Sequence, residues 1–388
     1  MFLLSIIIPL IGLLVFYLIC KWDLRTCGIY AGSAIGISLL LAFFCYLGGT
    51  RQNYFNEIWN YRAMAVRYYE SWDETVPCRH PKYRMVTHTD SDGNVTTEMV
   101  FDGYEHFYDV DWHPEHWTAA TEYNTEVGIS NGEYEAWKKL WNNVHFVDMK
   151  RHYHSKDGDM YQSDWTKEFD TIFPLEHTQT YENKVRVSNS VFNYPPVSKE
   201  IAKKYFRPAD KSIGAAVMSY DGTAYSEYDN LTLRRLNANL GVAHRVHTIT
   251  LLWDGNRNSR SVMEDVLAAW KGPNKNELVI AIGLGKNREV IWCDVYSWCD
   301  DTTIHSLVRQ YIVELGTFNS RKICDILAKR IPEKWVKKDF RIFNYIKNPM
   351  PGWCYVLSLI LSMITSTATG VVIIRNGGDY GSWDNYRS

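Results

Sequence analysis

The chain has 388 residues, of which 46% are hydrophobic, and its 42 Lys and Arg residues against 44 Asp and Glu residues give a formal net charge of −2. This length allows about two folded domains, at roughly 100 to 200 residues each. The slightly negative charge argues against a nucleic-acid partner, because proteins that bind nucleic acids need a basic surface to displace counterions from the phosphates.

Three long segments contain no charged residue and divide the chain. They are residues 2–20, 28–49 and 353–374. Because about 20 apolar residues in a helix cross a bilayer core, we predict a two-helix transmembrane hairpin within residues 1–50, a third transmembrane helix near the C-terminus, and a short tail at 375–388. The first segment lacks the basic start and the small-residue cleavage site of a signal peptide, which favours an uncleaved anchor.

These spans place residues 50–352 on one side of the membrane and only short segments on the other. The short segments carry four basic residues, Lys21, Arg25, Arg375 and Arg387. Cytoplasmic loops are enriched in Lys and Arg, and short loops count most, so this distribution favours an integral membrane protein with a large extracytoplasmic domain. Basic residues in the connector at 333–352 favour the opposite orientation.

The second apolar segment contains glycine at every fourth position, at Gly28, Gly32 and Gly36. In an apolar helix this spacing forms a flat stripe against which another helix can pack closely. We therefore predict helix packing through these three glycines. The partner is either another span of the same chain or a second membrane protein in an oligomer.

Residues 51–205 are rich in aromatic side chains and show more strand patterns than helix patterns. Residues 57–72 predict a long half-buried strand, and the alternating runs around an Asp-Gly pair in 84–101 predict a hairpin. Ser130 and Glu133 have the spacing of a capping box, which predicts a helix start. We expect an aromatic-rich α+β domain. This segment also resembles uncharacterised membrane proteins encoded by bacteriophages, which implies no particular function.

Two short patterns in this region are candidates for a metal site. Cys78-x-His80 and His113-x-x-His116 combine a thiolate with imidazoles at short spacing. Zinc accepts both ligand types, so we predict a zinc site if the two patterns fold together. Surface histidines on loops without a metal are the alternative interpretation.

A second histidine-rich stretch is "HFVDMKRHYHSKDGDMY", residues 145–161. The pair Asp157-Gly158 predicts a tight turn. If the residues beside it form a strand, His152 and His154 lie on the same face, because side chains alternate along a strand. Two such histidines could bind a metal or transfer protons, and the alternative is the polar side of an ordinary hairpin.

Residues 206–332 follow a different pattern, in which helix and strand alternate. The predicted order is α-β-α-β-β-α-α, and it rests on "LNANLGVAHRVHTITLL", "VLAAWKGPNKNELVIAIGLGKNREVIW" and "CDDTTIHSLVRQYI". These segments resemble the TPM-domain family, an α/β module of extracytoplasmic domains in membrane proteins. The resemblance implies an α/β domain beside a membrane anchor, and it permits the calcium binding or phosphatase-like activity described for some members.

Four aspartates lie where the predicted strands end and a predicted helix begins. They are Asp254, Asp294, Asp300 and Asp301. Carboxylates that converge at such positions can hold a hard cation such as calcium. Asp300 and Asp301 have a second interpretation, because an aspartate before a helix caps its free N–H groups and favours its positive end.

No sequence signature of a known catalytic class is present. The chain contains no P-loop, no G-x-S-x-G and no H-E-x-x-H. We therefore expect a membrane-anchored, non-enzymatic ectodomain that serves as an interaction or assembly module for envelope or membrane proteins, including copies of itself. The alternative is a membrane-tethered hydrolase, phosphatase-like and dependent on a divalent metal such as zinc or calcium.

Overall fold

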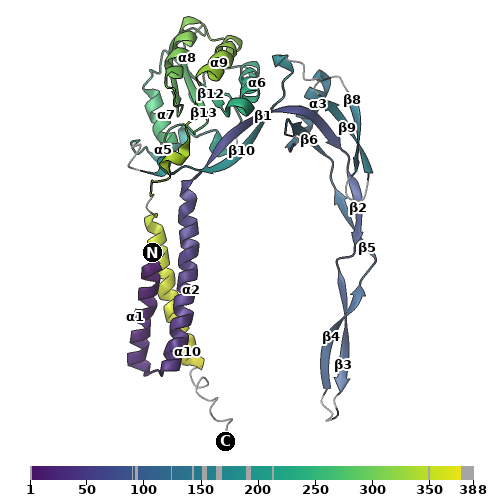
Figure 1. The fold of residues 1–388 in the computed structure, drawn as a ribbon, viewed down its shortest axis with the longest axis vertical. Helices are drawn as coiled ribbons and strands as arrows, with labels where there is room; N and C mark the ends of the chain where they lie inside the picture. The colour runs from purple at the N-terminus through teal and green to yellow at the C-terminus, as the bar shows by residue number, and fades with distance from the viewer. Residues whose placement is uncertain are drawn as a thin grey trace.

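In the computed structural model the chain has three parts: a bundle of long helices, an α/β domain next to one end of the bundle, and an arm of β-strands that leaves the α/β domain and runs back alongside the bundle (Figure 1). The mixed α/β character and the three membrane-spanning helices predicted from the sequence are confirmed. The structure describes residues 2–89, 91, 95–123, 125–141, 144–150, 155–162, 168–188, 194–211, 214–347 and 350–376.

The bundle consists of three helices that are long and apolar enough to cross a membrane: α1 (Phe2–Cys20), α2 (Leu24–Thr50) and α10 (Gly352–Asn376). Helix α2 begins four residues before the predicted span at 28–49. The reason is Asp23, whose side chain accepts a hydrogen bond from the backbone N–H of Thr26 and so caps the helix start.

Small and hydroxyl residues join the three helices. Ser5 of α1 lies 2.9 Å from Ser358 of α10, oxygen to oxygen, and the Tyr30 hydroxyl of α2 hydrogen-bonds Ser366. A Cβ atom added to Gly12 would collide with Tyr30 and Ser366. These contacts fit the general pattern of membrane helices, in which small residues allow close approach and hydroxyl groups bond across the interface.

The predicted glycine stripe is not part of this packing. Apart from the neighbouring backbone of α2 itself, no atom of the described chain lies within 4 Å of a Cβ placed on Gly28, Gly32 or Gly36. Helix α2 instead buries its other face, which includes Tyr30 and Ala34. Packing of the stripe against another span of the same chain is therefore wrong, because the stripe points away from α1 and α10.

The α/β domain is a sheet between two layers of helices. Its strand order is β11-β12-β13-β14, with β14 antiparallel to the others. The strands are β11 (Val217–Ser219), β12 (His247–Asp254), β13 (Glu277–Leu284) and β14 (Val290–Ser297). The predicted order of helices and strands is confirmed from α6 (Glu227–His244) onward. Strand β11 was missed because three residues are too few to show a periodic pattern.

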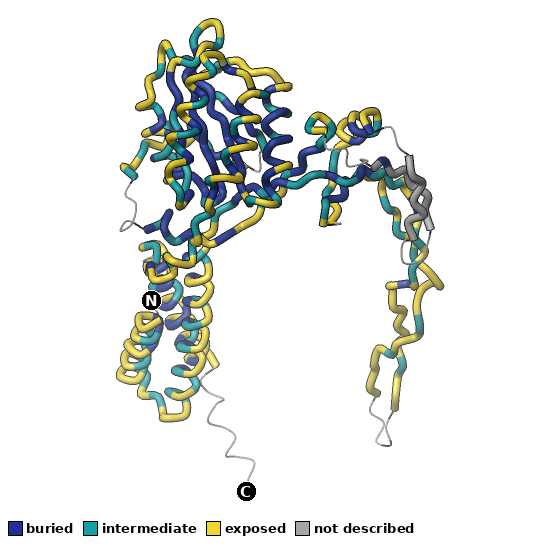
Figure 2. The backbone as a smooth tube through the Cα atoms, turned by 45° about the horizontal axis from the view of Figure 1, so that its top comes forward, coloured by how far each residue is buried: buried dark blue, intermediate teal, exposed yellow. Residues whose placement is uncertain are grey.

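Helices cover both faces of this sheet. One face packs against α6 (Glu227–His244), α8 (Thr303–Glu314) and α9 (Ser320–Lys334), and the other against α7 (Val262–Trp270). Alternate residues of β12 and β13 enter the two cores, which explains why both strands read as continuous apolar runs. Figure 2 shows this buried interior.

Residues before the expected boundary at 206 also pack on the α/β domain. Tyr205 enters the core beside Trp253, and α5 (Lys199–Lys204) lies against α7. The other short helices among the described residues are η1 (Arg51–Asn53), η2 (Phe169–Thr171), α4 (Lys184–Val187), η3 (Ala209–Lys211) and η4 (Phe340–Phe343).

Strand β1 (Tyr54–Tyr69) links the α/β domain to the arm. Its first half pairs with β10 (Pro174–Glu182), and its second half pairs with β6 (His116–Thr121) and β9 (Ser155–Gln162). The sheet continues through β7 (Glu126–Ile129) on one side and β8 (Val144–Lys150) on the other. The predicted long strand is therefore confirmed. Its first half, paired with β10, lies at the α/β domain, and its second half, paired with β6 and β9, lies in the sheet of the arm.

Helix α3 (Asn131–Leu140) covers this arm sheet, and its predicted capping box is present. The Ser130 hydroxyl accepts from the Glu133 backbone N–H at 3.2 Å, while the Glu133 carboxylate accepts from the Ser130 N–H at 2.9 Å. The helix buries Tyr134 and Trp137. Trp137 stacks on Phe173 with ring centroids 4.4 Å apart. The capping box that starts α3 therefore also positions the aromatic core of the arm.

Beyond this sheet the arm narrows to a two-stranded ribbon. It consists of a proximal pair, β2 (Trp72–Pro77) with β5 (Tyr108–His113), and a distal hairpin, β3 (Pro81–Thr89) with β4 (Val95–Tyr104). The hairpin predicted around the Asp-Gly pair is confirmed. Figure 2 shows the distal hairpin exposed along nearly its whole length.

The turn predicted at Asp157-Gly158 is wrong. Both residues lie within β9, where Asp157 pairs with Asp148 and Gly158 pairs with Val147 of β8. The strand ladder with β8 overrides the local turn preference of an Asp-Gly pair. His152 and His154 lie outside the described residues.

Candidate metal centre

Four possible metal ligands meet where the proximal pair joins the distal hairpin. Cys78 and His80 lie between β2 and β3, His106 lies between β4 and β5, and Asp109 is the second residue of β5. One ligand atom from each of the four side chains lies within 4.8 Å of all the others. Each side of the ribbon thus contributes two ligands.

The distances within this cluster are short. The Cys78 sulfur lies 4.0 Å from His80 Nδ1, and His80 Nδ1 lies 3.2 Å from Asp109 Oδ1. His106 Nε2 hydrogen-bonds the same Asp109 oxygen. This bond is the main reason that the pKa of Asp109 is lowered to about 2, so the carboxylate is ionised at neutral pH and available as a ligand.

The four side chains form a donor set that suits zinc. Zinc binds thiolate, imidazole and carboxylate at about 2.0 to 2.3 Å in a tetrahedron, which places neighbouring donor atoms about 3.3 to 3.8 Å apart. Donor atoms within 4.8 Å reach this geometry through small side-chain movements. Four protein ligands leave no open coordination position, which is typical of a structural zinc site and not of a catalytic one.

The structure brings together Cys78 and His80 from the predicted zinc site but not its two other residues. His113 Nε2 lies 2.8 Å from Glu74 Oε2, and the His113 ring stacks on Trp72. His116 stacks on the ring of Tyr69. Both histidines belong to strands nearer the base of the arm, so the combination with Cys78 and His80 is wrong.

The sequence contained a signal for one of the two ligands that were not predicted, His106. In a hairpin, residues at equal distances from the turn lie opposite each other. Counting outward from the Asp92-Gly93 pair places residue 105 opposite His80, next to His106. Combining the hairpin prediction with a search for ligands on the opposite strand would therefore have found His106.

The four aspartates predicted as calcium ligands do not converge. No three of Asp254, Asp294, Asp300 and Asp301 bring ligand atoms together in the part of the chain that the structure describes. Asp254 accepts from the backbone of Asn256 at 3.0 Å, Asp300 lies 2.6 Å from the Lys338 ammonium, and Asp301 accepts from the Thr303 backbone N–H at 3.0 Å. Asp294 lies within β14, opposite Ala281, and accepts from the Tyr296 hydroxyl at 3.0 Å.

For Asp301 the alternative interpretation is the observed one, since its carboxylate accepts hydrogen bonds from the first turn of α8.

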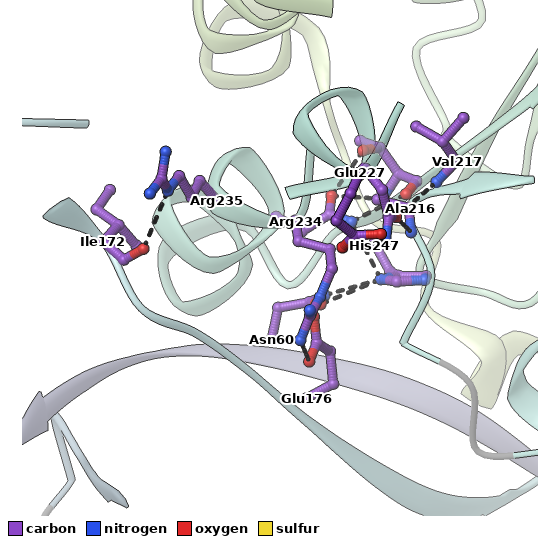
Figure 3. A network of polar contacts seen from close by, with 12 residues as sticks. Asn60, Ile172, Glu176, Ala216, Val217, Glu227, Arg234, Arg235 and His247 are labelled. Atoms are coloured by element: carbon purple, nitrogen blue, oxygen red, sulfur yellow. Dashed lines mark hydrogen bonds and ion pairs between the residues drawn. The ribbon is translucent and has the colours of Figure 1, made fainter. Parts of the chain in front are cut away.

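A polar network, partly buried at Arg234 and Glu176 and fully buried at His247, fixes the base of the arm to the α/β domain (Figure 3). The Arg234 guanidinium of α6 donates two hydrogen bonds of 2.7 Å to the Glu176 carboxylate of β10. Asn60 of β1 lies 3.1 Å from Nδ1 of His247 on β12. Burial lowers the pKa of His247 to about 3, so this histidine is neutral and serves structure.

Comparison with known protein families and with curated proteins finds no match for this chain. The resemblance of residues 206–332 to the TPM-domain family therefore stays a prediction.

Proposed function

We propose that this protein is a membrane-anchored, non-enzymatic assembly module that joins copies of itself through its arm. The observation that carries this proposal is the uncovered apolar face of the distal hairpin. The large domain is extracytoplasmic in this proposal, as the basic residues of the short segments favour. The order of elements in the α/β domain supports the TPM-like module as its globular part.

One face of the distal hairpin carries apolar side chains in facing pairs. Tyr83 pairs with Phe101 and Met85 pairs with Met99 across the ladder. Met85 and Met99 are 70% and 62% exposed, so nothing in the described chain covers this face. The opposite face carries charged residues, including Arg84 and Glu98 of β3 and β4. An isolated two-stranded ribbon of this kind is at best marginally stable in water.

The hairpin also has two open edges. In the described chain β3 and β4 pair only with each other, which leaves a row of backbone N–H and C=O groups unpaired on each outer side. Such edges accept a further strand by β-augmentation. A partner strand would pair the free backbone groups on each edge of the hairpin, and an apolar environment would cover its exposed apolar face.

A second copy of the chain meets these requirements directly. The three spans orient every copy in the same way in the membrane, so neighbouring hairpins run in the same direction. Strand β4 of one copy then lies antiparallel to β3 of the next, which is the pairing that each hairpin already uses internally. The apolar faces of all copies come together on one side of the shared sheet.

Lipid is the environment that fits this apolar side. Figure 1 shows β3 and β4 well to one side of the helix bundle, level with the lower end of the spans. Strands of 9 to 11 residues cross a bilayer when tilted, and β3 and β4 have 9 and 10 residues. In lipid only a sheet whose edges are all paired is stable, which again requires several copies.

The experiment compares two substitutions that add the same charge to opposite faces. Met99→Glu places a carboxylate on the apolar face, and Thr96→Glu places one on the charged face, where Thr96 pairs with His88. We expect native mass measurement of the full chain in mild detergent to show oligomers for the wild type and Thr96→Glu, and monomers for Met99→Glu. A wild-type monomer in several detergents would contradict the proposal.

A membrane-tethered, metal-dependent hydrolase is the second candidate, because a metal-ligand cluster is present. Its four protein donors leave no position for a reacting water. Hydrolysis of phosphate esters by the zinc-loaded full chain, lost in Cys78→Ser, would favour the hydrolase over the assembly module. No hydrolysis above the protein-free rate is the result that we expect.

A further inference from the structure

We propose that Cys78, His80, His106 and Asp109 bind one structural zinc ion, and that this ion holds the distal hairpin in a fixed orientation on the arm. This inference concerns the construction of the arm and does not depend on what the hairpin contacts. An arm that binds no zinc would contradict this inference but not self-assembly. A chain that stays monomeric would contradict self-assembly but not the zinc site.

The cluster lies at a break in the strand ladder. Pairing of the proximal strands ends at Pro77 with Tyr108, and pairing of the distal strands begins at Pro81 with Tyr104. Between these pairs the backbone is joined by a hydrogen bond of 3.0 Å from the Glu105 N–H to the His80 carbonyl. A two-stranded ribbon with such a break is free to bend, because it has no third strand or helix to support it.

The arrangement of the ligands is that of a cross-link. Cys78 and His80 come from the outgoing chain, and His106 and Asp109 come from the returning chain. A metal bound by all four therefore ties the two sides of the ribbon together at the break. The histidine rings already lie close, with centroids 5.3 Å apart.

Neighbouring groups prepare two of the ligands for a metal. The backbone N–H of His80 donates to the Cys78 sulfur at 3.3 Å and so holds it in place beside the other donors. The backbone N–H of Arg79 donates to Asp109 Oδ2 at 2.7 Å, which leaves Oδ1 directed at the two histidines. Hydrogen bonds of this kind orient metal ligands and tune their affinity.

The surroundings also favour a cation of this type. The Arg79 guanidinium is paired with Asp111 and so is not directed at the cluster. Cys78 is only 7% exposed, which protects the thiol from oxidation. Thiolate and imidazole ligands select zinc over calcium or magnesium, which prefer oxygen.

The test measures zinc bound to the full chain in detergent after loading with zinc and dialysis. We expect one zinc per chain in the wild type and at least a tenfold loss of affinity in Cys78→Ser and His106→Ala. The matched control is His88→Ala, since His88 is an exposed histidine of the same hairpin that lies 3.7 Å from Glu98. Unchanged zinc in this control supports the site. No zinc in the wild type, or equal zinc in all four proteins, overturns it.

A second readout tests the role of the ion at the joint. Amide hydrogen exchange is compared in the wild type with zinc and with a chelator. Zinc should slow exchange in residues 78–80 and 105–107 and have no effect in Cys78→Ser. Equal exchange in both conditions for the wild type would overturn the claim that the metal fixes the orientation of the hairpin.

Discussion

At the scale of single residues, the polar groups that join β1 and β10 to the α/β domain are structural. Glu176 is half-buried, and this desolvation raises the pKa of its carboxyl, while the paired Arg234 acts in the opposite direction. His247 is fully buried beside Asn60 and Asn237. Perturbed pKa values often mark active sites, but here they mark the attachment of the arm.

His247 gives the domain a pH-dependent stability. Its pKa is lowered by burial to about 3 in the folded chain, against about 6.5 when unfolded. Between these values only the unfolded chain takes up the proton, so stability is full above pH of about 6.5 and falls as the pH decreases. The slope reaches about 1.4 kcal/mol per pH unit.

We therefore expect urea denaturation of the wild type to lose more stability between pH 7.5 and pH 5 than denaturation of His247→Gln does. The comparison is made within each protein, so any cost of the substitution itself cancels. The exposed His88 serves as the control, and His88→Ala should keep the wild-type pH dependence. The same pH dependence in His247→Gln as in the wild type would contradict the prediction.

At the scale of elements, predictions from local sequence were correct where a single strong pattern determines the element. The three spans, the distal hairpin and the capping box at Ser130 all follow from a few residues and are present. The Asp157-Gly158 turn failed because pairing between β8 and β9 determines the structure there. The glycines of α2 indicated helix packing, but sequence periodicity does not say which face of a helix meets the rest of the chain.

The capping box of α3 is open to a direct test. Ser130→Ala removes the hydroxyl that accepts from the Glu133 backbone N–H, and loss of such a cap costs about 1 kcal/mol. Because α3 holds Trp137 against Phe173, we expect a lower urea midpoint together with a change in tryptophan fluorescence. Ser130→Asp, which keeps an acceptor at this position, should restore most of the stability.

At the scale of the whole molecule, the candidate metal centre shows what a sequence leaves open. Cys78 and His80 were recognisable, but their partners lie 26 or more residues further along the chain and meet them only through hairpin pairing. The exposed apolar face was also hidden, because an alternating strand pattern normally means that one face is buried. The structure leaves the apolar residues of the distal hairpin uncovered, including Met85 and Met99.

The assembly of copies through this hairpin is tested most directly by cross-linking between two forms of the chain in membranes. One form carries Thr87→Cys on β3 and the other Thr97→Cys on β4, and these positions share a face. Neighbouring strands bring such side chains within about 5 Å, so a short thiol cross-linker should join one form to the other well above the wild-type background. Only uncross-linked chains, at expression levels where the wild type is oligomeric, would contradict assembly through the arm.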